Sequence, residues 1–128
     1  MKRVLLKLSG EALAGDKHTG FDEETCLKVA GQVKKIMDDG IQVGIVIGGG
    51  NFWRGRTSEN IDRAKSDQIG MLATVMNCIY VSEIFRSVGI RTKIFTPFTC
   101  GPMAEMFTKD AALECLVAGK AVFFAGGT

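Results

Sequence analysis

A lysine at the end of a short apolar run is the first group in this sequence that could do chemistry. It stands in Lys7-Leu8-Ser9-Gly10-Glu11-Ala12, where a strand-like segment enters a small turn. A lysine so placed can meet phosphate oxygens, and backbone N–H groups of a turn made of small residues can bind the same anion. The segment lacks the Walker A and G-x-G-x-x-G patterns of P-loop and dinucleotide-binding proteins. By itself it also fits a lysine that faces solvent beside an ordinary turn.

Three consecutive glycines after the next apolar run form a second candidate. They follow Ile45-Val46-Ile47 and lead into Asn51. Because glycine costs backbone entropy, a glycine run directly after a buried strand indicates close contact between the backbone and another group. A phosphate at the amino end of a helix beginning at Asn51 is the expected partner, although a permissive turn without a ligand also fits. Arg54 can reach the same space as a second cation, with Arg56 as a substitute, although each also fits a solvated loop.

A carboxylate followed by a glycine lies at the start of a long apolar segment, in Asp67-Gln68-Ile69-Gly70-Met71-Leu72-Ala73-Thr74. Asp67 could favour the helix dipole, or it could accept hydrogen bonds from the two hydroxyls of a ribose. Gly70 inside an otherwise good helix predicts close approach of a ligand or of another backbone. The apolar side chains around it fit a core or an interface better than a cofactor site.

Metal binding and nucleophilic catalysis are not predicted. His18 is the only histidine, and no cysteine or carboxylate cluster stands at ligand spacing. Ser9 has no histidine partner that would make it a nucleophile. The four cysteines are far apart and contain no CxxC pair, which favours a reducing, cytoplasmic setting over a disulfide framework or a zinc site.

Composition limits the partners. The 128 residues are 46% hydrophobic, which suits one globular domain, and the net charge of +2 is too small for nonspecific binding of nucleic acid or a membrane surface. The longest apolar stretch runs from Ile69 to Val88. It carries Asn77, Glu83 and Arg86, so we expect a buried helix and no membrane span. Lys7 interrupts the first apolar run too early for a secretion signal.

The order of the apolar segments predicts the fold class. Short β-rich runs alternate with longer segments of helical periodicity, and the runs cover residues 4–8, 43–47, 90–95 and 121–124. This alternation predicts an α/β fold of three layers, with helices on both faces of a mainly parallel sheet. The sequence stops at Ala125-Gly126-Gly127-Thr128, directly after a strand. Because ligands of open parallel sheets bind at the carboxyl ends of strands, we expect the fold to be truncated inside a site.

Three helical segments are expected between the strands, closed by glycines at their carboxyl ends. They cover residues 22–40, about 62–89, and a region from Pro102 to Gly119 in which Asp110 is a possible restart. The second of them is apolar around most of its circumference. It should therefore be central, or pack against a partner subunit.

Taken in order, these motifs resemble the bacterial UMP kinases of the amino-acid-kinase superfamily. The resemblance spans the whole chain and is carried by Lys7 to Leu13, Gly44 to Asn51 with Arg54-Gly55, Asp67 with Gly70 to Thr74, and Phe124 to Thr128. The first two motifs are shared across the superfamily, whereas the Gly-Met-Leu-Ala-Thr helix favours the UMP kinase branch. The resemblance implies that residues 1–128 are the amino-terminal, acceptor-binding part of the domain, and that a carboxy-terminal ATP-binding part is absent.

On this resemblance, the whole protein transfers the γ-phosphoryl group of ATP to UMP, giving UDP in pyrimidine nucleotide biosynthesis, with Mg²⁺ bound to ATP. Gly50 and Arg54 would face the ATP phosphates. Lys7 would also stabilise the charge of the transferred group, which makes it the expected catalytic residue. The other expected ATP-phosphate contacts are the residues that follow it, Leu8, Ser9 and Gly10.

The acceptor side is expected to use three other residues. Gly49 would contact the phosphate of UMP, Asp67 would bind its ribose, and Thr128 would begin the next UMP-binding loop. The resemblance also implies a homo-oligomer, a hexamer built from dimers, with GTP and UTP as effectors. A lone amino-terminal half is expected to be inactive.

Two other functions stay open at this point. The chain could belong to another kinase of the superfamily, such as an acetylglutamate kinase or an aspartokinase, whose acceptor is a carboxylate. Asp67 argues against it, because a negative side chain suits a ribose diol better than a carboxylate. The chain could also be a non-catalytic nucleotide-binding or assembly module.

Overall fold

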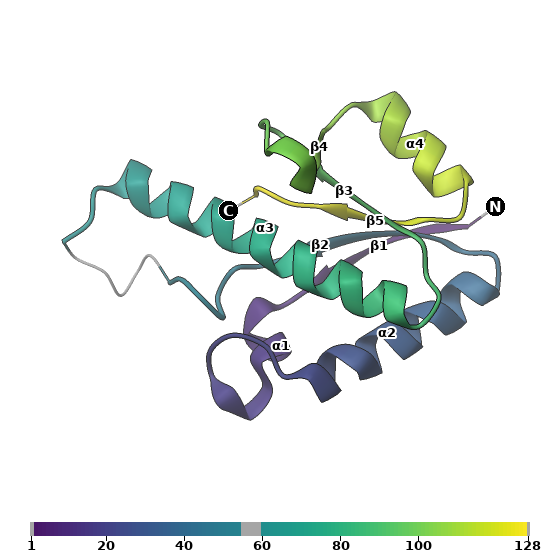
Figure 1. The fold of residues 1–128 in the computed structure, drawn as a ribbon, viewed down its shortest axis with the longest axis horizontal. Coiled ribbons are helices and arrows are strands. Elements are labelled where there is room, and N and C mark those ends of the chain that lie inside the picture. The colour runs from purple at the N-terminus through teal and green to yellow at the C-terminus, as the bar shows by residue number, and fades with distance from the viewer. Residues whose placement is uncertain (1, 55–59, 128) are drawn as a thin grey trace.

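One parallel sheet organises the chain. The computed structural model describes residues 2–54 and 60–127, and its five strands lie in the order β1-β2-β5-β3-β4 (Figure 1). All four strand pairings are parallel, so the predicted mainly parallel sheet is confirmed. The strands are β1 Arg3–Leu8, β2 Gln42–Ile47, β3 Thr92–Thr96, β4 Glu105–Met106 and β5 Ala121–Phe124.

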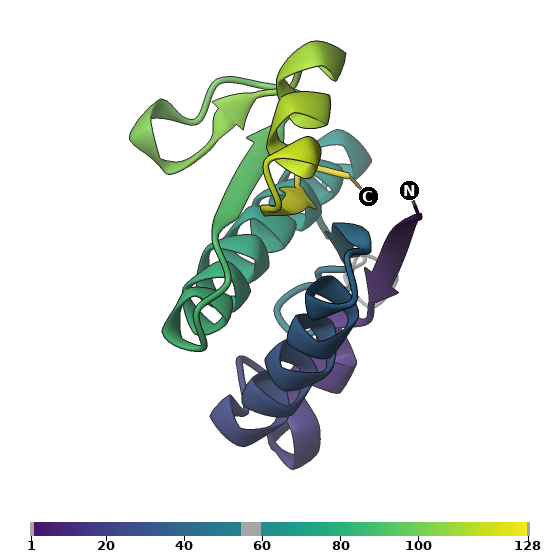
Figure 2. The ribbon, with the colours of Figure 1, turned by 90° about the vertical axis from the view of Figure 1, so that its right-hand side faces the viewer.

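Helices cover both faces of the sheet, as predicted. Helices α2 and α3 pack in the larger hydrophobic cluster on one face, and α4 packs in a smaller cluster on the other (Figure 2). The α-helices are α1 Gly10–Ala14, α2 Glu23–Asp38, α3 Arg63–Ser87 and α4 Lys109–Val117, and the 3₁₀ turns are η1 Gly15–Lys17 and η3 Gly101–Met103. The three-layer α/β/α fold is therefore confirmed.

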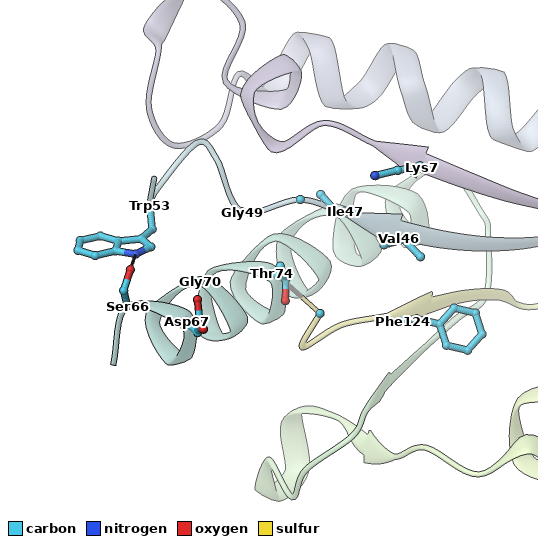
Figure 3. A pocket seen from close by; sticks show the side chains of 12 residues that line it. Lys7, Val46, Ile47, Gly49, Trp53, Ser66, Asp67, Gly70, Thr74 and Phe124 are labelled. Carbon is cyan, nitrogen blue, oxygen red and sulfur yellow. Dashed lines mark hydrogen bonds between the residues drawn. The ribbon is translucent and has the colours of Figure 1, made fainter. Parts of the chain in front are cut away.

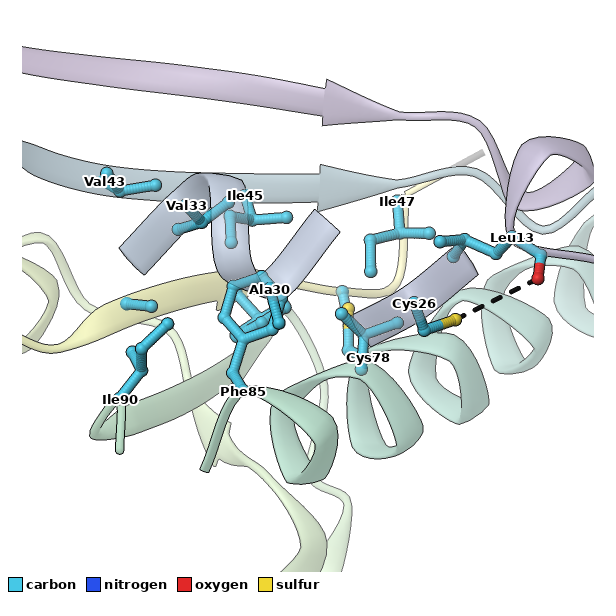
Figure 4. Close-up of a cluster of buried hydrophobic side chains, with 14 of the residues drawn as sticks. Leu13, Cys26, Ala30, Val33, Val43, Ile45, Ile47, Cys78, Phe85 and Ile90 are labelled. Carbon is cyan, nitrogen blue, oxygen red and sulfur yellow. Dashed lines mark hydrogen bonds between the residues drawn. The ribbon is translucent and has the colours of Figure 1, made fainter. Parts of the chain in front are cut away.

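The core lies between the sheet and the pair α2 and α3. Val43, Ile45 and Ile47 alternate along β2, so all three point to the same face, where they are fully buried (Figure 4). Phe85 of α3 meets Phe123 of β5 edge to face there, with ring centroids 5.2 Å apart. Each such fully buried side chain contributes roughly 1.5–3 kcal/mol by leaving water.

The capping residues predicted from the sequence lie at the ends of the helices. The Asp22 carboxylate accepts hydrogen bonds from the hydroxyl and the backbone N–H of Thr25, and these bonds lower the pKa of Asp22. Gly40, Gly89 and Gly119 follow α2, α3 and α4 with φ of 85°, 90° and 83°. A residue with a side chain is strained in this left-handed conformation, so glycine is the residue that ends a helix in this way.

Two boundaries differ from the predictions. The strand expected from Ile90 begins at Thr92, because the N–H of Ile90 binds the Phe85 carbonyl and closes the end of α3. The helix expected after Pro102 is only a 3₁₀ turn, followed by the short strand β4. Helix α4 begins after Thr108, whose hydroxyl accepts from the N–H of Ala111. Strand β4 has only two residues and both are exposed, so no hydrophobic pattern in the sequence could have predicted it.

Helix α3 is long and apolar enough to cross a membrane by length and composition, and no other helix in the described residues is. Core helices pass the same test. Here Val75, Cys78, Val81 and Phe85 place one side of α3 in the main hydrophobic cluster against the sheet. The structure therefore assigns that side to the core.

Candidate functional site

A cavity of about 260 Å³ opens at the carboxyl ends of β1, β2 and β5, beside the first turns of α3 (Figure 3). Strand β5 enters the sheet beside β2 here, so neighbouring strands no longer follow chain order. Open parallel sheets bind ligands at such a point. The cavity is lined by Lys7, Val46, Ile47, Gly48, Gly49, Trp53, Ser66, Asp67, Gly70, Thr74, Phe124 and Gly127.

Three of the predicted site residues line this cavity from three different elements. Lys7 comes from β1, Gly49 from the loop after β2, and Asp67 from α3. Gly70, singled out in the sequence, lies one turn beyond Asp67 on the same wall. The predicted contact Thr128 lies outside the described residues, as does Arg56.

The side chains of Lys7 and Asp67 are both exposed, and neither side chain forms a hydrogen bond or ion pair with another residue in the described ranges 2–54 and 60–127. The cavity thus offers one cation and one carboxylate to a ligand, together with the backbone of the glycine run. A cation and N–H groups suit phosphate, and a carboxylate suits hydroxyl donors. The lining therefore fits a molecule that carries both a phosphate and hydroxyl groups.

The residues after Lys7 serve the fold more than the cavity. Ser9 and Gly10 do not line it: the Ser9 hydroxyl accepts from the N–H of Ala12 at 3.3 Å and caps α1, so the expected open turn is the start of a short helix. A Cβ on Gly10 would lie 2.3 Å from the Gly48 carbonyl oxygen, which only glycine avoids. Leu8 is half-buried against the main core.

Gly50 and Arg54 lie beside the cavity, around Glu11. The Arg54 guanidinium forms an ion pair with the Glu11 carboxylate and donates to the Gly50 carbonyl at 3.4 Å. A Cβ on Gly50 would lie 2.4 Å from a Glu11 oxygen, so this glycine lets the carboxylate lie over the loop. The pair joins α1 to the loop after β2, although its exposure keeps its contribution to stability small.

Asn51 does not begin a helix, so that prediction is wrong. Its side chain is 2% exposed and forms a reciprocal amide pair with Asn77 of α3, at 3.0 and 2.8 Å. Asn51 also donates to the Gly20 carbonyl, and Asn77 donates to the Gly48 carbonyl at 2.7 Å. These bonds hold the backbone at Asn51 in a turn, and α3 begins at Arg63.

Two further hydrogen bonds hold the cavity wall, and neither was predicted from the sequence. The Trp53 indole N–H donates to the Ser66 hydroxyl at 3.0 Å, which ties the glycine loop to the first turn of α3. The N–H of Gly126 donates to the Thr74 hydroxyl at 2.7 Å, which ties the chain just after β5 to the fourth turn of α3. Thr74, a polar residue inside the apolar segment, was the available signal for the second bond, whereas Ser66 stands among other polar residues and gave none.

Metal ligands are not grouped in this part of the chain. Among residues 2–54 and 60–127, no three histidine, cysteine, aspartate or glutamate side chains are arranged to hold an ion. The four cysteines are free thiols, and burial raises the pKa of Cys78 to about 12, so its thiol stays neutral. Among the described residues, the charged side chains at or beside the cavity are Lys7, Asp67 and the Glu11–Arg54 pair.

Comparison with known proteins gives the family. The sequence pattern of the Amino acid kinase family matches residues 2–128. This chain belongs to the amino acid kinase family. It is 45% identical to the uridylate kinase of Bacteroides thetaiotaomicron over 129 aligned positions, which cover 99% of this chain and 55% of that protein.

Solved structures agree with the amino acid kinase assignment. The crystal structure of UMP kinase from Bacillus anthracis matches with a TM-score of 0.93 and 37% identity, over 99% of this chain and 53% of that one. UMP kinase from Ureaplasma parvum matches with a TM-score of 0.92 and 26% identity, over 99% and 56%. The chain thus spans about half the length of the relatives that it matches.

Proposed function

We propose that this chain forms the acceptor-binding part of a UMP kinase, which transfers the γ-phosphoryl group of ATP to UMP and gives UDP and ADP. The observation that carries the proposal is the cavity in which Lys7, Gly49 and Asp67 meet from three separate elements. The 45% identity to a uridylate kinase supports the same acceptor. The carboxy-terminal part of a UMP kinase, which would bind ATP, corresponds to the half of the relatives outside this match.

In the proposed reaction, an oxygen of the UMP phosphate attacks the γ-phosphorus of ATP. The new P–O bond forms while the bond between the γ-phosphorus and the β–γ bridging oxygen breaks, which releases ADP. Catalysis of this kind depends on alignment of the two nucleotides and on neutralisation of charge. Lys7 supplies the positive charge, Gly49 brings backbone to the acceptor phosphate, and Asp67 orients the ribose.

Magnesium would enter with ATP, since Mg²⁺ is commonly held by nucleotide phosphates and one or two carboxylates. The described residues contain no group of three ligands for it, so we assign no residue of this chain as a magnesium ligand. Gly50 and Arg54 follow the lining residues Gly49 and Trp53 in the chain, and the resemblance implies that they face the donor phosphates. Glu11 would have to release Arg54 for the guanidinium to bind a phosphate.

Calorimetric titration tests the acceptor. The chain, shown to be folded by circular dichroism, is titrated with UMP, CMP, AMP and N-acetylglutamate. Preferential binding of UMP supports the proposal. Preference for N-acetylglutamate would favour the carboxylate kinases of the family, and a folded chain that binds none of the four would favour a non-catalytic module.

Substitution of Lys7 tests the catalytic assignment. In a chain completed with the carboxy-terminal half of the Bacteroides thetaiotaomicron relative, Lys7→Ala should lower kcat by about 10²–10³ or more, because one charge-stabilising group is worth roughly that much. Binding of UMP should be unchanged. Exposed Lys109, at the start of α4, is a matched control, and turnover by Lys7→Ala equal to that of Lys109→Ala would show that Lys7 has another role.

The proposed whole protein is a cytoplasmic homo-oligomer. Exposed apolar side chains on α3, among them Leu72 at 54% and Met76 at 47%, support a partner subunit on this side of the helix, and four free thiols suit a reducing compartment. Sedimentation of the completed chain would distinguish monomer, dimer and hexamer. The response to GTP and UTP stays a prediction from the resemblance.

A further inference from the structure

Gly70 occupies a position where helix stability favours almost any other residue. It lies in the eighth position of α3, which continues for 17 more residues to Ser87. Glycine is among the poorest helix formers, because it loses the most backbone freedom and adds no packing side chain. Some other property of the position must therefore account for it.

The fold does not require glycine at this position. A Cβ built on Gly70 would meet one atom within 4 Å, the Trp53 Cδ1 at 3.9 Å, which is an ordinary contact. By contrast, a Cβ on Gly49 would come within 3.0 Å of the Ala73 Cβ and 3.2 Å of the Gly70 carbonyl oxygen. The close approach between loop and helix is thus made by Gly49, while the space above Gly70 is open.

That open space is the cavity itself. Gly70 lines it between Asp67, one turn earlier, and Thr74, one turn later (Figure 3). Residues three to four apart lie on the same face of a helix, so Gly70 adjoins Asp67 on this wall, within reach of a group that the Asp67 carboxylate binds. A methyl group at position 70 would point into the volume that such a group occupies.

We propose that Gly70 is a specificity-determining residue, whose missing side chain lets the ribose of the acceptor lie against the helix beside Asp67. The inference rests on the proposed function and deepens it, since it selects acceptors that carry a sugar. It explains the missing side chain of Gly70 by the ligand and that of Gly49 by packing against the helix, while the Gly49 backbone keeps its proposed contact with the acceptor phosphate.

A matched pair of variants separates this role from a role in folding. Gly31 lies inside α2, has nothing within 4 Å of a built Cβ and does not line the cavity. Gly31→Ala and Gly70→Ala should both raise the urea midpoint, because alanine is the better helix former. Their binding of ligands should differ.

Calorimetry with UMP, ribose 5-phosphate and inorganic phosphate gives the second readout. Gly70→Ala should weaken UMP and ribose 5-phosphate at least about tenfold, which corresponds to about 1.4 kcal/mol, and should leave inorganic phosphate unchanged. Gly31→Ala should change none of the three. Binding of UMP by Gly70→Ala at wild-type affinity would overturn the inference and leave the proposed function standing.

The remaining outcomes are equally distinct. A lower urea midpoint for Gly70→Ala would show that glycine is needed for packing, and equal loss of inorganic phosphate would show that the methyl group only distorts the loop at Gly49. Either result overturns the inference. A folded wild-type chain that binds ribose 5-phosphate and UMP no better than inorganic phosphate would overturn the proposed function, and this inference with it.

Discussion

The two halves of α3 belong to the same helix and face different surroundings. Residues 63–74 carry Ser66, Asp67, Gly70 and Thr74 on the wall of the cavity, whereas residues 75–87 place Phe85 and its neighbours in the core. The first half is rich in polar and small side chains, and the second half fills the space against the sheet. Ligand binding and stability are thus separated along one continuous element.

This separation explains why α3 has a weak sequence pattern as an amphipathic helix. Its buried side changes character along its length, and its opposite side carries exposed apolar residues, so no single polar stripe runs from end to end. The comparison predicts that substitutions in the second half mainly change the free energy of unfolding. Substitutions in the first half should mainly change affinity for the ligand.

The largest effect is expected in the core half. Phe85→Ala should lower the free energy of unfolding by about 3–5 kcal/mol, because it removes a fully buried ring and leaves a cavity against Phe123. Urea denaturation measures the loss. Leu72→Ala, on the exposed side of the same helix, is the control and should change stability far less. Similar losses in the two variants would contradict the assignment of the core.

The boundary between the halves should affect both properties. Asn77→Ala leaves the buried Asn51 amide and the Gly48 carbonyl without their partner, at a cost of about 1–3 kcal/mol for each unsatisfied group. It should also weaken UMP binding, because the glycine loop loses its anchor. Ser82→Ala, which removes only a local bond to the Ile79 carbonyl, is the control. Unchanged UMP affinity in Asn77→Ala would show that the anchoring of the glycine loop does not contribute to UMP binding.

In the cavity half, Asp67→Asn should weaken UMP binding by about 1.5–3 kcal/mol, roughly 10- to 150-fold, because hydrogen bonds to a charged acceptor are lost. The free energy of unfolding should stay within about 0.5 kcal/mol of the wild-type value, since the carboxylate is exposed. Calorimetry and urea denaturation give the two values. Asp110→Asn in α4 is the control. UMP binding by Asp67→Asn at wild-type affinity would show that Asp67 does not bind the ribose.

Alkaline pH tests the core half in a different way. Burial raises the pKa of Cys78 from its ordinary 9.0 to about 12. Between these two values the Cys78 thiol is deprotonated in the unfolded chain and keeps its proton in the folded chain. The free energy of unfolding is therefore largest below pH 9 and falls above it, by up to about 1.4 kcal/mol per pH unit. Cys78→Ala should reduce this slope in urea denaturation at pH 9–11. Part of the pH dependence should remain in Cys78→Ala, because burial also raises the pKa of Cys26.

Much of the fold could be predicted because local signals were strong. Asp22 as an N-cap, and the glycines at 40, 89 and 119, gave helix boundaries through hydrogen bonding and backbone geometry alone. Strand β4 and the turn at Asn51 could not be predicted in this way. Strand β4 is held by its pairing with β3, and Asn51 by an amide that comes from 26 residues away.

The candidate site was predicted in part. Lys7, Gly49 and Asp67 were singled out by residue type and by their positions after strands or beside a helix start, and they line one cavity. Trp53 and Ser66 were missed, because a hydrogen bond between a loop and a helix leaves no periodic trace in the sequence.

The sequence by itself determined the alternation of strands and helices, the glycine-closed helix ends and the family resemblance, because each depends on neighbouring residues or on motif order. Only the tertiary structure decided which glycine serves which purpose. Gly10 and Gly49 are needed where two backbones approach, and Gly70 faces open space. In the sequence these glycines cannot be told apart. They differ in which atoms of the folded chain would lie within 4 Å of a Cβ at each position.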